Sequence, residues 1–111
     1  MGKTLQFPIN LPKEKIIAFC KKWKIREFSF FGSVVRDDFG SESDIDVLVK
    51  YASDAKRSLF RQVEAQDELA EILGRPVDLL SKTAIENSDN NFRREQILDE
   101  AQVYYSDEEA A

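Results

Sequence analysis

The feature that most constrains the fold of this chain is a long amphipathic helix pattern that lies between two short apolar strand patterns. Over residues 56–73, apolar side chains recur at the spacing of a helix with one buried face. Gly74 and Pro76 end this helix, because glycine caps helix C-termini and proline cannot continue a helix. Strands are predicted over residues 44–49 before it and 77–80 after it. Strands that alternate with helices predict an α/β domain.

The same periodicities place the remaining elements. A helix over residues 13–24 puts Cys20 on its apolar face, so we expect a core thiol rather than a reactive one. A last helix over residues 92–101 is expected to turn its apolar residues inward, Phe92 among them. The other predicted elements are a strand over residues 25–31, a short helix over 33–36 and a short edge strand over 103–105.

Together these elements predict an α/β (α+β) fold in which a short mixed sheet is flanked by helices. We expect one domain over residues 1–111, with an N-terminal lead over 1–11 and an acidic tail over 106–111. The strand over residues 44–49 ends in a continuous apolar run, which favours a central position in the sheet.

The absence of histidine excludes several kinds of active site. A chain without imidazole cannot run a Ser-His-Asp or Cys-His relay, and it cannot build a zinc site that needs histidine. Cys20 is the single cysteine, so neither an intrachain disulfide nor a cysteine metal cluster can form, which fits a reducing compartment. Chemistry must therefore come from carboxylates, hydroxyls, backbone amides, Arg and Lys, or a metal ion held by oxygen.

Charge and hydropathy limit the partners and the location. With 21 acidic against 16 basic residues, the net charge of −5 weighs against non-specific nucleic-acid binding, which relies on Lys and Arg. No apolar run reaches the ~18 residues that a membrane-spanning helix requires, and we expect a cytoplasmic protein without membrane contact.

Gly32-Ser33 is the first of three features that point to a phosphate-handling site. It falls where a strand ends and a short helix begins, so the glycine lets the backbone approach a ligand, and the helix start offers unpaired N–H groups. Ser33 adds a hydroxyl donor. A Gly-Ser turn after a strand is common, and by itself it is more consistent with an ordinary turn.

Asp44 and Asp46 form the second feature. Residues i and i+2 of a strand share a face at a spacing of about 6–7 Å, and two carboxylates there repel each other unless a cation lies between them. Two Mg²⁺ ions bridged by carboxylate oxygens, about 3.5–4 Å apart, meet that need. By itself, Asp-x-Asp is more often a solvent-exposed strand start with two ordinary acids.

Asp78 is the third feature, a lone acid within a short apolar strand. Such an acid is costly unless it reaches solvent, a partner or a metal. If this strand lies beside the strand over residues 44–49, Asp78 can join the other two carboxylates. An edge strand with Asp78 facing water explains the residue equally well.

Taken together, the three features resemble the signature of the nucleotidyltransferase superfamily that includes DNA polymerase beta. In its smallest branch, the minimal nucleotidyltransferases (MNT), the signature is Gly-Ser, two variable residues, Arg, a loop, Ser-Asp-x-Asp and a later acid. The interval from Gly32 to Asp44 has the length expected for that branch, and the resemblance extends from the first strand to the third. The matching residues are Gly32, Ser33, Arg36, Ser43, Asp44, Asp46 and Asp78.

The resemblance implies transfer of a nucleoside monophosphate from a nucleotide triphosphate, with ATP as the substrate and pyrophosphate as the leaving group. Gly32 and Ser33 would grip the β- and γ-phosphates through backbone amides and the hydroxyl. Asp44 and Asp46 would hold two Mg²⁺ ions. Asp78 would bind the second ion and help to draw the proton from the attacking hydroxyl.

Arg36 and Ser43 complete the nucleotide-binding candidates, each with a local alternative. Arg36 could meet the phosphates or pair with Asp38 to hold the loop, and Ser43 could orient the aspartate that follows it or cap the strand. The chain departs from the family pattern at Val35, where a small residue is frequent, and at Asp37, where glycine is usual. Both departures bear on nucleotide affinity and base choice more than on the carboxylates.

Stand-alone members of this branch are typically antitoxins paired with a HEPN-family ribonuclease toxin, to which they add AMP on a tyrosine. The resemblance therefore implies an antitoxin that is a protein adenylyltransferase, with a HEPN toxin as its partner in a hetero-oligomer. Two other functions stay open. One is a nucleotidyltransferase subunit that acts on a small molecule or RNA, and the other is a non-catalytic antitoxin that neutralises its toxin by binding.

Overall fold

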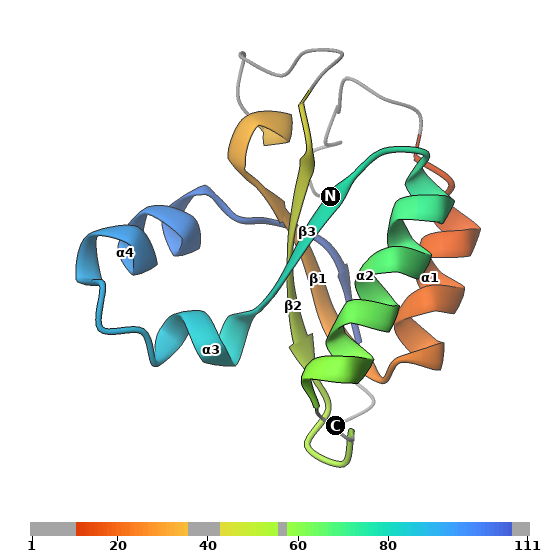
Figure 1. Ribbon diagram of the computed structural model, residues 1–111, viewed down its shortest axis with the longest axis horizontal. Helices are drawn as coiled ribbons and strands as arrows, with labels where there is room; N and C mark the ends of the chain where they lie inside the picture. Colours follow the sequence, from red (N-terminus) through yellow and green to blue (C-terminus); the bar gives the residue numbers. More distant parts are fainter. Residues whose placement is uncertain (1–10, 36–42, 56–57, 108–111) are drawn as a thin grey trace.

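The computed structural model of the chain describes residues 11–35, 43–55 and 58–107. Strands lie in the middle of the molecule, and helices lie on both sides of them (Figure 1). In chain order the elements are α1 (Lys13–Lys22), β1 (Ile25–Phe31), the 3-10 helix η1 (Gly32–Val35), β2 (Ile45–Tyr51), α2 (Leu59–Leu73), β3 (Val77–Ser81), α3 (Lys82–Glu86), α4 (Asn91–Glu100) and β4 (Gln102–Ser106).

The four strands form one mixed sheet in the order β3-β2-β1-β4. β1 is antiparallel to both of its neighbours, whereas β2 and β3 are parallel and α2 connects them. Parallel neighbours require such a crossover, because the chain must return to the same end of the sheet before the next strand begins. The predicted mixed sheet flanked by helices is confirmed, and so is the interior position of the strand predicted over residues 44–49.

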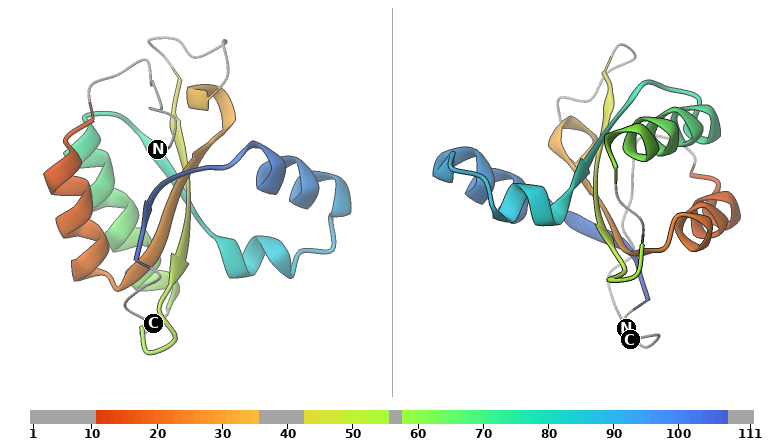
Figure 2. Two further views of the ribbon diagram at one scale, coloured as in Figure 1. Left: turned by 180° about the vertical axis from the view of Figure 1, so that it is seen from behind. Right: turned by 60° about the horizontal axis from the view of Figure 1, so that its bottom comes forward.

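Helices pack on both faces of the sheet. α1 and α2 lie together on one face, and α3 and α4 lie on the other side (Figure 1 and Figure 2). The larger hydrophobic cluster includes Val47 and Val49 of β2 and residues of α1 and α2, whereas Leu48 belongs to a smaller cluster with residues of α3 and α4. Since successive residues of a strand point to opposite faces, Asp46 is assigned to the α3–α4 face.

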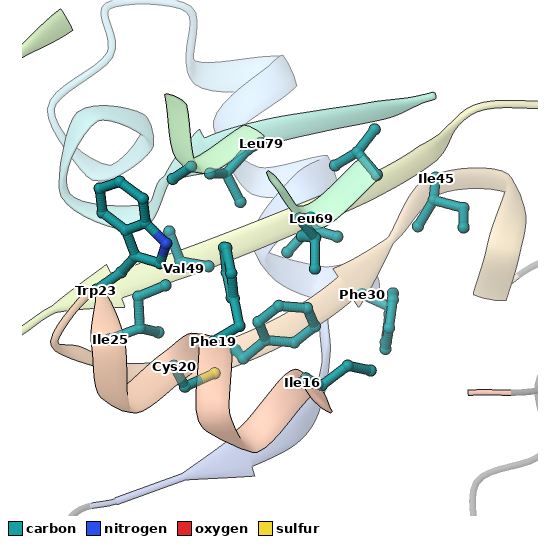
Figure 3. Packing of buried hydrophobic residues seen from close by; sticks show 14 of the residues in the cluster. Ile16, Phe19, Cys20, Trp23, Ile25, Phe30, Ile45, Val49, Leu69 and Leu79 are labelled. Carbon is teal, nitrogen blue, oxygen red and sulfur yellow. The ribbon is translucent and has the colours of Figure 1, made fainter. Parts of the chain in front are cut away.

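Cys20 lies inside the larger cluster, as its place on the apolar face of the predicted helix indicates. Its side chain is fully buried, and Figure 3 shows the sulfur among the apolar side chains of that cluster. Desolvation by this burial raises the pKa of the thiol to about 12, which keeps it protonated. The prediction of a core thiol is confirmed.

The ends of α2 are set by local capping. The Ser58 hydroxyl accepts a hydrogen bond from the Arg61 N–H at 3.1 Å, which satisfies one of the free donors of the first turn. Gly74 adopts a left-handed conformation at φ 71° and ends the helix, as predicted. Residues 56–57, where the helix was predicted to begin, lie outside the described residues.

The prediction that Phe92 turns inward is wrong, since its side chain is 80% exposed. Ile97 is the buried residue of α4, and Phe92 precedes it by five positions. At about 3.6 residues per turn, these two side chains point in nearly opposite directions around the helix. Other large apolar side chains are exposed in α2, namely Leu59, Phe60 and Val63.

The helix α3 was not predicted, and the edge strand predicted over residues 103–105 is confirmed as β4. The lead over residues 1–11 and the tail over 106–111 lie mostly outside the described residues. Within the described part of the chain, the helices are too short or too polar to cross a membrane.

Candidate active site

Asp46 and Asp78 lie side by side on neighbouring parallel strands. The register pairs Asp46 of β2 with Asp78 of β3, so the third predicted acid does join the second. Both carboxylates lie on the α3–α4 face, because the residues on either side of each belong to the larger cluster on the opposite face. β3 is also an edge strand, and Asp78 is exposed. The Asp78 carboxylate therefore lies next to Asp46 and is also open to solvent.

Gly32 brings the Gly-Ser turn against the Asp46 carboxylate. It has a φ of 77°, in the left-handed region that favours glycine. A β-carbon at this position would collide with Oδ2 of Asp46 and would come within 3.1 Å of its Cγ. Ser33 follows in η1 and is half-buried. The first predicted feature and one acid of the second therefore meet in space.

Arg75 fixes the chain just before the Asp-x-Asp pair. Its Nη1 donates a hydrogen bond to the Ser43 carbonyl oxygen at 2.9 Å, and the Ile45 N–H donates to the Pro76 carbonyl at 3.0 Å. These contacts hold the start of β2 against the start of β3. Asp44 lies between the two contacts and is exposed.

Glu100 is a fourth carboxylate at the site, and it was not among the residues predicted from the sequence. It is the last residue of α4, is half-buried, and its Oε1 accepts the backbone N–H of Gly32 at 3.2 Å. The two residues are 68 positions apart. Neither the helical periodicity nor the spacing of acids distinguishes Glu100 from its neighbours.

Two residues predicted to bind the nucleotide remain, Arg36 and Ser43. Arg36 lies outside the described residues, and Ser43 contributes its backbone carbonyl to the Arg75 contact. Among the residues that the structure describes, no three acidic or thiol side chains gather into a group that could hold a metal ion. The donors nevertheless fit Mg²⁺ in kind, since Asp46 and Asp78 present carboxylate oxygens in register and Mg²⁺ prefers oxygen ligands.

A groove of about 590 Å³ lies at the opposite end of the parallel strands and does not include these carboxylates. It is lined by Tyr51 at the end of β2, Ser81 at the end of β3 and Trp23, among others. None of the described residues that line it is acidic. We therefore locate the candidate active site at Gly32, Asp46 and Asp78, where the groups capable of phosphate and metal chemistry meet.

Comparison with known proteins finds relatives along most of the chain. The model of the nucleotidyltransferase domain family matches residues 13–104. A protein of Methanocaldococcus jannaschii, named provisionally as a protein adenylyltransferase, is 38% identical over 93 residues, which cover 84% of this chain and 94% of the relative. The protein adenylyltransferase MntA of Thermococcus cleftensis is 33% identical over 67 residues, covering 60% of this chain and 66% of that protein.

Solved structures share the fold. A crystal structure of a toxin–antitoxin with AMP-PNP superimposes with a TM-score of 0.67 at 22% identity, covering 89% of this chain and 77% of the other. A structure of the tri-AMPylated HEPN toxin of Shewanella oneidensis in complex with its MNT antitoxin gives a TM-score of 0.58 at 20% identity, covering 88% and 73%. At these identities the similarity shows a common architecture.

Proposed function

This chain belongs to the nucleotidyltransferase domain family, and from that premise we propose that it is the antitoxin of a HEPN/MNT pair. In this proposal it transfers AMP from ATP to a tyrosine of a HEPN-family ribonuclease toxin. The transfer would block the toxin covalently. Pyrophosphate, which consists of the former β- and γ-phosphates, would leave, and the hydroxyl proton of the tyrosine would pass to a carboxylate of the site.

The relatives support the adenylyl-transfer and toxin-partner parts of this proposal. Two proteins that are 38% and 33% identical to this chain over the aligned residues are named as protein adenylyltransferases, the first of them provisionally. Of the structures with the same architecture, one contains AMP-PNP and another pairs an MNT antitoxin with an AMPylated HEPN toxin. An acceptor carried by a partner protein is therefore favoured over a small molecule.

The observation that carries the proposal is the position of the Asp46 carboxylate, which fills the space that a β-carbon of Gly32 would need and lies beside Asp78. A phosphate oxygen that accepts the Gly32 N–H would lie close to both acids. Two carboxylates next to a phosphate repel it unless cations are present, so the arrangement suits a nucleotide that binds with metal ions.

The chain's carboxylates would hold the Mg²⁺ ions. Asp44, Asp46 and Asp78 supply oxygen donors, and Mg²⁺ is commonly bound through one or two carboxylates together with substrate phosphates. This mode of binding does not require a preformed group of three side chains. When bound, the ions would supply neutralisation of the phosphate charge and a lower pKa of the attacking hydroxyl.

Other residues would position the nucleotide and move the proton. The Ser33 hydroxyl is available to a phosphate oxygen next to the Gly32 amide, and we assign Arg36 and Ser43 to the nucleotide as well. Asp78 is exposed at the sheet edge, where a hydroxyl presented by a partner could reach it, and it would accept the proton. Catalysis would then rest on positioning and charge neutralisation, without imidazole.

The proposal is tested by incubating the protein with α-labelled ATP, Mg²⁺ and the HEPN-family protein encoded beside it. We expect label on that partner, and mass spectrometry should locate AMP on a tyrosine. The double substitution Asp44→Ala with Asp46→Ala should abolish labelling. Its matched control is Glu64→Ala with Asp67→Ala, which removes two exposed carboxylates from α2 on the opposite face of the sheet and should label normally.

Three results would contradict the proposal. The first is a wild-type protein that labels no partner, and the second is an Asp44/Asp46 double variant that labels as well as the wild type. The third is label that appears on RNA or a small molecule instead of the partner protein. A double variant that no longer labels but still protects cells from the toxin would show that neutralisation occurs by binding alone.

A further inference from the structure

The Glu100 side chain occupies the backbone N–H that the proposed function assigns to a phosphate. Its Oε1 accepts the Gly32 N–H at 3.2 Å. A backbone amide has one hydrogen to donate, so the Glu100 carboxylate and a phosphate oxygen compete for the same group. Both competitors are anionic acceptors of a charge-assisted hydrogen bond.

We propose that Glu100 is a gate on the nucleotide site, whose carboxylate holds the Gly32 amide until a triphosphate displaces it. The inference rests on the proposed function, because it takes Gly32 as part of the phosphate grip. It adds a residue that regulates access to that grip. In this arrangement Glu100 lowers nucleotide affinity, which is the opposite of what a ligand-binding residue does.

The charges around Gly32 favour displacement of the Glu100 carboxylate when a triphosphate binds. Asp46 contacts the α-carbon side of Gly32 and Glu100 contacts its N–H, so two carboxylates already converge on one residue. A triphosphate would add further negative charge at the same place. Glu100 is half-buried, so the repulsion between it and a phosphate is screened less than at the surface.

The position of Glu100 allows it to move. It is the last residue of α4, and the next residue, Ala101, is already extended, so no further helical turn encloses the side chain. Ile97 is the buried residue of α4 and anchors the helix through the smaller cluster. Displacement of the Glu100 carboxylate from the Gly32 N–H would therefore require a change of side-chain rotamer and no movement of α4.

Binding of AMP-PNP in the presence of Mg²⁺ to the purified full chain tests the gate by calorimetry. We expect Glu100→Ala to bind AMP-PNP about tenfold more tightly than the wild type, which is the factor that corresponds to one charge-assisted hydrogen bond no longer being displaced. Glu100→Gln keeps an oxygen acceptor but loses the charge, so a smaller gain is expected. The gain should be confined to ligands with β- and γ-phosphates and should be absent with adenosine.

The matched control is Asp99→Ala. Asp99 is the exposed neighbour of Glu100 on α4, and its removal changes the net charge of the protein by the same amount. Its AMP-PNP affinity should equal that of the wild type. A gain of the same size in Asp99→Ala would overturn the gate in favour of a general charge effect.

Hydrogen exchange of the Gly32 amide provides an independent test. In the nucleotide-free wild type its N–H should exchange slowly with solvent, and in Glu100→Ala it should exchange faster, measured by NMR. Unchanged or weaker AMP-PNP binding by both Glu100 variants would overturn the gate while leaving the proposed function intact. Absence of binding in the wild type and in both variants would overturn the proposed function together with the gate.

Discussion

Asp46 of β2 stands directly opposite Asp78 of β3 in the parallel register, so two like charges face each other across neighbouring strands. Like charges directly opposite each other destabilise a sheet. Carboxylates that bind a cation and a nucleotide repel each other, and so lower the stability of the fold, when the cation and the nucleotide are not bound. Stability and function should therefore respond in opposite directions when the exposed charge of Asp78 is removed.

Replacing Asp78 with asparagine tests this opposition. We expect Asp78→Asn to raise the free energy of unfolding by less than about 1 kcal/mol, because the carboxylate is exposed and its repulsion is screened. AMP transfer should fall by a factor of about 100 or more, since a proton acceptor is lost. Urea unfolding and the labelling assay measure the two effects. Asp67→Asn on α2 should change neither, and equal activity of Asp78→Asn and wild type would exclude a catalytic role.

A comparison of Gly32→Ala with Gly74→Ala should separate the effect of backbone strain from the effect of a β-carbon that strikes the Asp46 carboxylate. Gly32 and Gly74 both have a left-handed φ, at 77° and 71°, but only Gly32 has a neighbour that an added β-carbon would strike. Both alanine variants should lose about 1 kcal/mol of stability from the strained φ. Gly32→Ala should in addition lose AMP transfer, because the Asp46 carboxylate must move away. An active Gly32→Ala protein, or an inactive Gly74→Ala protein, would contradict this account.

The parts of the fold that depend on local periodicity could be predicted from the sequence. Gly74 ends α2 because a left-handed residue is needed there and glycine adopts it easily. The pairing of Asp46 with Asp78 could be stated only as a condition, because periodicity does not say which strands are neighbours. α3 was missed because a helix of five residues, Lys82–Glu86, is too short to show a period; the Ser81 hydroxyl caps it by accepting the Ala84 N–H.

The residues of the candidate site that were missed act across long sequence separations. Glu100 meets Gly32 across 68 positions, and Arg75 meets Ser43 across 32. Each contact joins a side chain to a backbone atom, so the sequence around the backbone partner contains no signal of it. The carboxylates and the Gly-Ser turn were predictable because their chemistry requires particular residue types at short spacing.

Arg75 is expected to act through the chain that precedes Asp44. Its hydrogen bond to the Ser43 carbonyl holds that segment, so Arg75→Ala should lower kcat/KM for AMP transfer about tenfold through misplacement of Asp44. Arg75→Lys keeps the charge but not the planar group, and it should recover only part of the activity. Arg93→Ala removes an exposed arginine of α4 and provides the control. Equal kinetics of Arg75→Ala and Arg93→Ala would exclude a positioning role.

Gln66 protects the exposed edge of the sheet at β3. The Leu79 N–H donates to Gln66 Oε1 at 3.0 Å, and Gln62 Nε2 donates to the Leu79 carbonyl at 2.8 Å, so two side chains of α2 bind the backbone of this edge strand. Gln66→Ala should cost about 1–2 kcal/mol in urea unfolding, because it leaves the Leu79 N–H without its acceptor.

Gln66→Glu keeps an acceptor at the same place, so it should recover most of the stability lost in Gln66→Ala. The exposed Glu64 of α2 offers a control, since Glu64→Ala removes a side chain of the same helix that faces solvent. If Gln66→Ala and Glu64→Ala were equally stable, the hydrogen bond between Gln66 and Leu79 would contribute nothing to the stability of the protein.

Cys20 should make the protein less stable at alkaline pH. Burial raises the pKa of its thiol from 9.0 to about 12, so the folded protein retains a proton that the unfolded chain loses. The stabilisation is fully present below pH 9.0 and is lost as the pH rises toward about 12. The free energy of unfolding should therefore fall by up to about 1.4 kcal/mol per pH unit in this window from this group alone.

Urea unfolding of the wild type and of Cys20→Ala between pH 8 and pH 10.5 isolates this contribution. Burial also raises the pKa values of Tyr104 and Tyr105. Tyr104 affects both proteins equally, whereas the raised pKa of Tyr105 includes a contribution from Cys20, so the difference between the two curves reports the thiol together with its coupling to Tyr105. Cys20→Ala should be less stable at pH 8, because a buried side chain is shortened, and the gap should narrow as the pH rises. Parallel curves would show that the thiol ionises as readily in the folded protein as in the unfolded chain, which the full burial of Cys20 argues against.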